Sequence, residues 1–353
     1  MAKGAYTGVD GVARKVVSPY VGVEGVARNV KNGYVGVEGV ARLFFAPDNG
    51  APVILQVEKV TSDTYAGETT YESEEFILLD IYPKPGGTVN VTYGGLTKTI
   101  TDTSGAEEPN AQKVFFGTFN GVSDSVATPA SGELTIEGGY TAFGVGSYGN
   151  SKGMLLYAGC ITAIQDWGNV KAFIPDNAFC GCKGLTSIVL PDDITSIGYG
   201  VFRNCTGLTS ITIPNNVSSI ESYAFSGCTG LTSIELNEGL KTIGEHAFHM
   251  PTQASSEIAL FKGTITFPST LESIGESAFR YDKYSGDSFY YTYIGIAIML
   301  SRTPPTLGDS AFGHNGNYSG SAYITVIVPK GCVEAYKTAE NWRGFAHYIT
   351  EES

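Results

Sequence analysis

Apolar positions recur at a constant interval in the second half of this 353-residue chain. A phenylalanine, usually preceded by alanine, returns every 23 residues, at Phe179, Phe202, Phe225 and Phe248. A unit of this length cannot bury its apolar face alone, so successive units are expected to stack as the coils of a solenoid. Stacking would lay Ile188, Ile211 and Ile234 over one another in a parallel strand ladder with a spacing of about 4.8 Å.

Each coil contains two apolar segments, which predict two walls around a common core. The first segments, LTSIVL, LTSITI and LTSIEL, have the L-x-x-I-x-L spacing of leucine-rich repeat strands. The second segments, ITSIG, VSSIE and LKTIG, place Ile197, Ile220 and Ile243 on the opposite wall. Two later coils are longer, because Phe279 and Phe312 follow the preceding repeat phenylalanine by 31 and 33 residues. Each extra stretch predicts an inserted loop, and loops of this kind commonly carry binding.

The repeated frame A-F-x-x-C-x-x-L-x-x-I-x-L-P resembles that of the BspA-like, or Treponema-type, leucine-rich repeat family over residues 160–353. The closing segment VIVPKGCVEAYKTAENWRGFAHYI resembles the terminal cap of that family, a last strand and then a short helix from about Val333 to Ala339. The chain departs from the family in the two insertions and in Asn237, which stands in place of proline. The resemblance implies a surface-displayed binding or adhesion module without catalysis, although a fold does not identify a partner.

A shorter repeat, Y-x-G-V-D/E-G-V-A-R, opens the chain at Tyr6, Tyr20 and Tyr34. Its acidic-Gly pair suits a two-residue turn between short Val-rich strands, so each copy is predicted to form one β-hairpin. Isolated hairpins are marginally stable, and we therefore expect this arm to join a neighbouring protein or identical chains. Residues 1–45 resemble the N-terminal segments of tail-region proteins of Firmicutes phages and prophages, although convergent Gly/Val-rich repetition would give the same motif.

The residues between the two repeats predict a separate antiparallel β domain. Alternating or β-rich runs such as VILQVEKV, TVNVTY and GELTIEGG are divided by turn-forming segments. A sandwich is the expected architecture. The predicted fold is therefore mainly β, with a hairpin arm at 1–48, a β-sandwich at 51–159 and a solenoid with a small helical cap at 160–353.

Charge and hydropathy narrow the classes of partner. The formal net charge is −13, and residues 1–50 carry six basic against four acidic side chains, which leaves −15 for the remainder. This balance disfavours nucleic acid, which requires a clustered basic face. The sequence contains neither an apolar leader nor a run of 18 apolar residues. We expect synthesis in a cytoplasm without membrane insertion, which a virion protein assembled inside its host would satisfy.

Candidate catalytic and metal-binding chemistry is sparse. Cys182, Cys205 and Cys228 keep the 23-residue interval and are expected to be buried free thiols. The pair Cys180 and Cys182 is a bare C-x-C without a partner pair, and the acidic stretch at 68–75 lacks the spacing of a calcium loop. No nucleophile, dinucleotide or phosphate-binding motif is present. We expect no cofactor, no metal and no catalytic residue.

The insertion YDKYSGDSFYYTYIG is the chemically conspicuous stretch of the chain. Its aromatic side chains suit protein hot spots and can also stack on sugars. The candidate ligand-binding residues are Tyr281, Tyr284, Phe289, Tyr290, Tyr291 and Tyr293, with His314 and Tyr318 from the next insertion. Among them Tyr284 and Tyr290 are favoured, because an alternating strand would use Tyr291 and Tyr293 merely to cover the widened coil.

Together these patterns predict a non-enzymatic receptor-binding protein, a homotrimeric fibre of a phage or prophage tail. Its arm would contact other tail proteins, and its solenoid would contact a bacterial surface protein or glycan. A cell-surface adhesin or host-interaction protein is the alternative. A depolymerase of envelope polysaccharide is a third class, disfavoured because the adjacent Asp192 and Asp193 would point apart.

Overall fold

The computed structural model confirms a mainly β fold and divides the chain into two compact units, Met1–Ala51 and Pro52–Ser353. In the first unit the structure describes six strands. In the second it describes residues 52–61, 75–104, 111–119, 122–138, 140–145, 147–149, 155–157, 159–167, 174–250, 263–283, 289–292, 294–313 and 324–352.

The first unit contains the three predicted hairpins, each a separate two-stranded antiparallel sheet. They are β1 (Tyr6–Val9) with β2 (Val12–Lys15), β3 (Tyr20–Val23) with β4 (Val26–Asn29), and β5 (Gly33–Val37) with β6 (Val40–Phe44). The registers place Val9 opposite Val12 and repeat this pairing in the other two copies. Each copy of the repeat therefore forms one antiparallel strand pair, which confirms the predicted hairpins.

The second unit begins with two antiparallel sheets that pack face to face. The first has the order β11-β10-β14-β7-β18, with strands Leu96–Thr101, Thr88–Tyr93, Ser131–Gly138, Val53–Glu58 and Ile161–Asp166. The second has the order β13-β12-β9-β15, with strands Val122–Ser123, Gln112–Phe119, Glu75–Pro83 and Tyr140–Val145, and the short β8 (Val60–Thr61) also pairs with β9. A two-stranded sheet, β16 (Ser147–Gly149) with β17 (Leu155–Tyr157), follows. Alternate side chains point inward, and the Tyr93 ring meets the Phe116 ring edge-on at 5.7 Å between the sheets.

The sandwich and the solenoid share a sheet and a core. The strand β18, which follows the predicted boundary at residue 159, pairs with β7 of the sandwich. The Glu58 backbone N–H donates to the Cys160 carbonyl at 2.8 Å, and the Val145 N–H donates to the Ala178 carbonyl at 2.7 Å. The end of the solenoid core is therefore covered by the sandwich.

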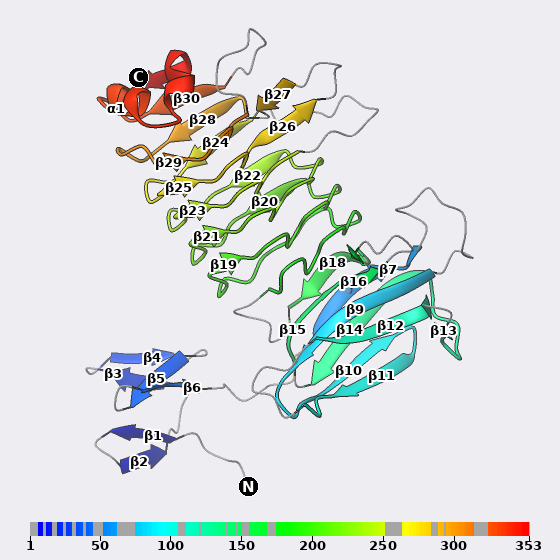
Figure 1. The fold of residues 1–353 in the computed structure, drawn as a ribbon. Coiled ribbons are helices and arrows are strands. Elements are labelled where there is room, and N and C mark those ends of the chain that lie inside the picture. Colours follow the sequence, from blue (N-terminus) through cyan, green and yellow to red (C-terminus); the bar gives the residue numbers. More distant parts are fainter. Residues whose placement is uncertain are drawn as a thin grey trace. The chain divides into compact units, whose positions relative to one another are not determined.

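The solenoid itself has two walls of parallel strands, one formed by a single sheet and the other by two (Figure 1). One ladder runs β19-β21-β23-β25-β29, with strands Ser196–Ile197, Ser219–Ile220, Thr242–Ile243, Ser273–Ile274 and Thr306–Leu307. The opposite wall contains β20 (Ser210–Thr212) with β22 (Ser233–Glu235), then β24 (Thr264–Phe267), β28 (Ile296–Met299), β30 (Thr325–Val328) and β31 (Ile349–Glu351).

The predicted isoleucine alignment is confirmed in part. Ile197, Ile220 and Ile243 pair in successive strands, and Ile211 pairs with Ile234. Ile188 lies outside the named strands and is half-buried. In this first coil, the Trp167 Nε1–H donates to the carbonyl of the next residue, Val189, at 2.8 Å.

A continuous column of phenylalanine rings fills the solenoid. Successive rings stack at centroid distances of 5.3, 5.2, 5.0, 5.0 and 5.7 Å, in the order Phe179, Phe202, Phe225, Phe248, Phe279 and Phe312. Phe143 and Trp167 close one end of the column, and Trp342 and Phe345 close the other. The predicted cap is present as α1 (Val333–Thr338), followed by the 3-10 helix Arg343–Tyr348.

Cys182, Cys205 and Cys228 are free and buried, as the repeat predicted, and so are the other three cysteines. The Cys205 Sγ–H donates to the Phe179 carbonyl, and the Cys228 Sγ–H donates to the Phe202 carbonyl, each at 3.0 Å. Burial raises the pKa of the Cys160 thiol to about 12 and that of Cys180 to about 11. The Cys205 and Cys228 thiols therefore tie neighbouring coils together, each through a hydrogen bond to a backbone carbonyl.

Candidate binding surfaces

The aromatic insertion forms a hairpin of β26 (Arg280–Lys283) and β27 (Phe289–Thr292). Tyr281 lies opposite Tyr291 in this hairpin, but the Tyr281 side chain is only 8% exposed and belongs to the hydrophobic core. Burial also raises the pKa of its hydroxyl. This side chain therefore packs on the core side of the widened coil, which favours a structural role for Tyr281 over contact with a ligand.

The structure leaves the other candidates in this region as predictions. Phe289, Tyr290 and Tyr291 lie on β27, where the strand is described and its side chains are not. The remaining candidates lie outside the described residues, namely Tyr284, Tyr293, His314 and Tyr318. The placement of Tyr291 on a strand agrees with the alternative that this residue covers the coil.

A second surface, which the sequence analysis missed, starts from an unusual backbone position. The residue two positions before each repeat phenylalanine has a left-handed conformation, with φ between 53° and 61°, in Asn177, Gly200, Tyr223, His246, Ser277 and Ser310. Its backbone N–H donates to a carbonyl of the next coil, as from Tyr223 to Glu245 at 3.0 Å and from His246 to Glu276 at 2.9 Å. Glycine and asparagine suit such a position, whereas other L-residues incur a cost of about 1–2 kcal/mol.

Two coils place bulky rings at this position, and these rings join their neighbours in a row. The Tyr223 ring lies 5.6 Å from the Tyr199 ring and stacks on the His246 ring at 4.9 Å. The His246 ring meets the His249 ring at 4.9 Å. We call Tyr199, Tyr223, His246 and His249 the lateral column. Tyr199 is 41% exposed, so the column reaches the surface of the protein.

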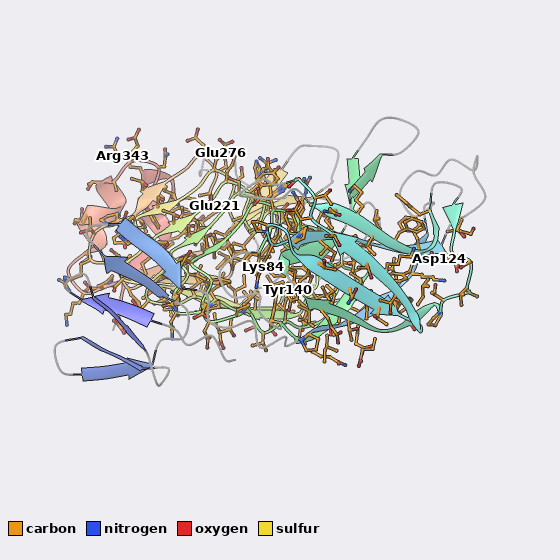
Figure 2. The ribbon with its side chains drawn as sticks, turned by 90° about the horizontal axis from the view of Figure 1, so that it is seen from below. Lys84, Asp124, Tyr140, Glu221, Glu276 and Arg343 are labelled. Atoms are coloured by element: carbon orange, nitrogen blue, oxygen red, sulfur yellow. The ribbon has the colours of Figure 1, made fainter. Side chains whose placement is uncertain are left out.

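Charged groups surround the lateral column. The Arg203 guanidinium lies over the Tyr223 ring at 5.4 Å, and Glu245 Oε1 lies 3.3 Å from His246 Nε2. Burial, followed by the carboxylate of Glu245, raises the pKa of Tyr223, so its hydroxyl stays protonated at neutral pH. Exposed carboxylates follow the same turns, at Glu221, Glu245, Glu276 and Asp309. Figure 2 labels two of them, Glu221 and Glu276.

The described residues are informative about metal ligands, membrane spans and acidic pairs. They contain no group of three or more His, Cys, Asp or Glu side chains that could hold a metal ion. No helix among them is long and apolar enough to cross a bilayer. Asp192 and Asp193 are both exposed, and the Asp192 carbonyl accepts a hydrogen bond from Asn216.

Parallel two-walled coils around one apolar column define a repeat solenoid, a class whose members typically bind partners through their outer surfaces. Residues 172–283 match the BspA type leucine rich repeat region in six copies, so this segment is a leucine-rich repeat region of that type. The resemblance seen in the sequence is confirmed over those residues.

Two solved structures of bacterial leucine-rich repeat proteins are similar to part of the chain. One is a leucine-rich repeat protein of T. pallidum, with 18% identity and a TM-score of 0.29, and the match covers 46% of this chain and 83% of that one. The other is a leucine-rich repeat protein from Bacteroides ovatus ATCC 8483, with 18% identity and a TM-score of 0.24, and the match covers 59% and 74% of the two chains. No curated protein matches the chain.

Proposed function

We propose that this chain is a non-enzymatic receptor-binding protein of a phage or prophage tail, and that its solenoid contacts a bacterial surface protein or glycan. The observation that carries the binding role is the filled interior of the BspA-type repeat region. Rings stacked 5.0–5.7 Å apart occupy the axis of the solenoid from Phe179 to Phe312. A ligand must therefore bind on the outer surface, where side chains vary from coil to coil.

The hairpin arm supports an attached and oligomeric form of the protein. Each hairpin is a two-stranded sheet by itself, an arrangement that is marginally stable in water. Pairing with tail proteins or with identical arms would supply the missing neighbours, and a trimeric fibre meets this need. The resemblance of residues 1–45 to phage tail-region segments points to the same context.

The tail role is tested by following the protein itself. A fibre should sediment as a stable trimer and co-purify with tail particles from an induced lysogen, as detected with an antibody against the chain. A monomer recovered only from cell envelopes would instead indicate a bacterial surface adhesin. The BspA-type repeat region supports the surface adhesin as well as it supports the tail fibre, since the family resemblance implies surface adhesion.

The binding role is tested by adsorption to bacterial cells. The double variant Tyr284→Ala/Tyr290→Ala should abolish adsorption and leave the melting temperature nearly unchanged. Tyr348→Ala removes an exposed tyrosine from the cap and serves as the matched control. Undiminished adsorption of the double variant would place the binding surface elsewhere. Release of reducing sugar from envelope polysaccharide would instead indicate a depolymerase.

A further inference from the structure

The lateral column consists of side chains that the core does not require. The phenylalanine column fills the interior, and the rings of Tyr199, Tyr223 and His246 contact one another outside it. Other coils place Asn177, Gly200 or serine at the left-handed position, and these small residues suit it better. Bulky rings held at an unfavourable backbone position point to a role on the surface.

The charge beside the column identifies the kind of partner that fits it. Hydrogen bonds from Tyr223 to Glu245, from His246 to Glu276 and from Ser277 to Asp309 place these three acidic residues at equivalent positions of successive coils. Their exposed carboxylates form a row with a backbone spacing of about 4.8 Å, which starts beside His246 and continues past the end of the column. Like charges at this spacing repel one another, and a row of cations would reduce that repulsion. The chain as a whole is also acidic, with a formal net charge of −13.

The protein itself shows how a cation meets these rings. The Arg203 guanidinium lies 5.4 Å from the centroid of the Tyr223 ring, within the range of a cation–π contact. The neighbouring Tyr199 ring is exposed at the same face. An arginine or lysine from another molecule would find there an aromatic face with carboxylates nearby.

We propose that the lateral column and the carboxylates of Glu245, Glu276 and Asp309 form a docking surface for a lysine- and arginine-rich segment of a partner protein. Basic side chains would stack on the tyrosine rings and pair with the carboxylates, and the acidic row would steer their approach. This surface shares no residue with the aromatic insertion proposed to contact the bacterial surface, and its test does not depend on that proposal.

The test measures binding of a fluorescein-labelled peptide of alternating lysine and serine to the full chain by fluorescence anisotropy. Glu245→Gln/Glu276→Gln should weaken binding about three- to tenfold, since each exposed ion pair contributes modestly. Glu133→Gln/Glu137→Gln is the matched control, because it removes the same charge from two exposed sandwich positions and should change affinity less than twofold. Tyr199→Ala should weaken binding about two- to fivefold, and the exposed control Tyr348→Ala should not.

Three results would overturn the proposal. The first is equal weakening by the two glutamine double variants, which would mean that net charge alone attracts the peptide. The second is an unchanged affinity of Tyr199→Ala, with its melting temperature also unchanged. The third is a lack of peptide binding while a neutral glycan binds and is lost on Tyr199→Ala, which would make the column a sugar platform.

Discussion

Replacing Phe225 by alanine tests whether the phenylalanine column holds the solenoid together as one core. The Phe225 side chain is fully buried and stacks between Phe202 at 5.2 Å and Phe248 at 5.0 Å. Truncation of a core phenylalanine costs about 3–5 kcal/mol, and each lost ring pair accounts for about 0.5–1.5 kcal/mol. Backbone hydrogen bonds of 2.8 and 2.7 Å, from Phe202 to Ala224 and from Phe225 to Ala247, fix the coil spacing. Because the coils cannot close over the cavity, we expect a loss of about 4–5 kcal/mol.

The two tryptophans of the chain provide a reporter at each end of this column. Trp167 packs on the Phe179 ring at 5.8 Å, and Trp342 packs on the Phe312 ring at 5.9 Å. Urea unfolding of the Trp167→Phe and Trp342→Phe variants, followed by fluorescence, isolates each reporter. A continuous core predicts that Phe225→Ala lowers the unfolding midpoint at both ends by the same amount.

Two outcomes would refute this reasoning. Repeat proteins are stabilised through nearest-neighbour contacts, so a weakly coupled solenoid would shift the two reporters by different amounts. A loss below about 2 kcal/mol would show that the coils do close over the cavity. Tyr199→Ala is the control for removal of an exposed ring and should cost less than about 1 kcal/mol.

Three further predictions concern the junction, acid stability and the thiols. Gly159→Ala should destabilise the second unit by about 1–3 kcal/mol, because the added Cβ would lie 2.0 Å from the Gly181 carbonyl oxygen. Calorimetry measures this loss, and an unchanged melting temperature would contradict the close approach. Asp102→Asn should lower stability at neutral pH, because hydrogen bonds, led by that of the Ser104 hydroxyl, hold the pKa of this carboxyl below its ordinary value. The loss of unfolding free energy in the variant should vanish as the pH falls through the lowered pKa of folded Asp102. Urea titrations across the acid range measure this loss, and a loss that stays constant with pH would contradict the lowered pKa. Native protein should resist iodoacetamide at Cys160, whose pKa is raised to about 12 by burial, and mass spectrometry should find it alkylated only after unfolding.

The tertiary arrangement shows what sequence patterns could not at particular residues. Tyr281 was grouped with the candidate ligand contacts because aromatic residues are frequent around it, but its side chain is buried. A high number of aromatic residues in a segment cannot distinguish a ring that covers a widened coil from one that faces solvent. The residues Tyr199 and Tyr223 were missed because they occupy different positions within their coils and are 24 residues apart in the chain.

The sequence by itself determined the features that repeat. The 23-residue interval specified the phenylalanine column, the stacked isoleucines and the buried thiols, because identical neighbours can satisfy one another only when equivalent positions align. The N-terminal repeat likewise specified three hairpins, since each copy forms one antiparallel strand pair.

Only the tertiary structure decided how unlike segments meet. It placed β18 in the sandwich sheet, so that the sandwich covers one end of the solenoid core, and it brought Tyr199, Tyr223 and His246 into one row. These contacts depend on strand register and on a left-handed backbone position, which join residues that share no periodic pattern. Periodicity therefore predicted the interior of the solenoid, whereas the arrangement of its surface side chains followed only from the tertiary structure.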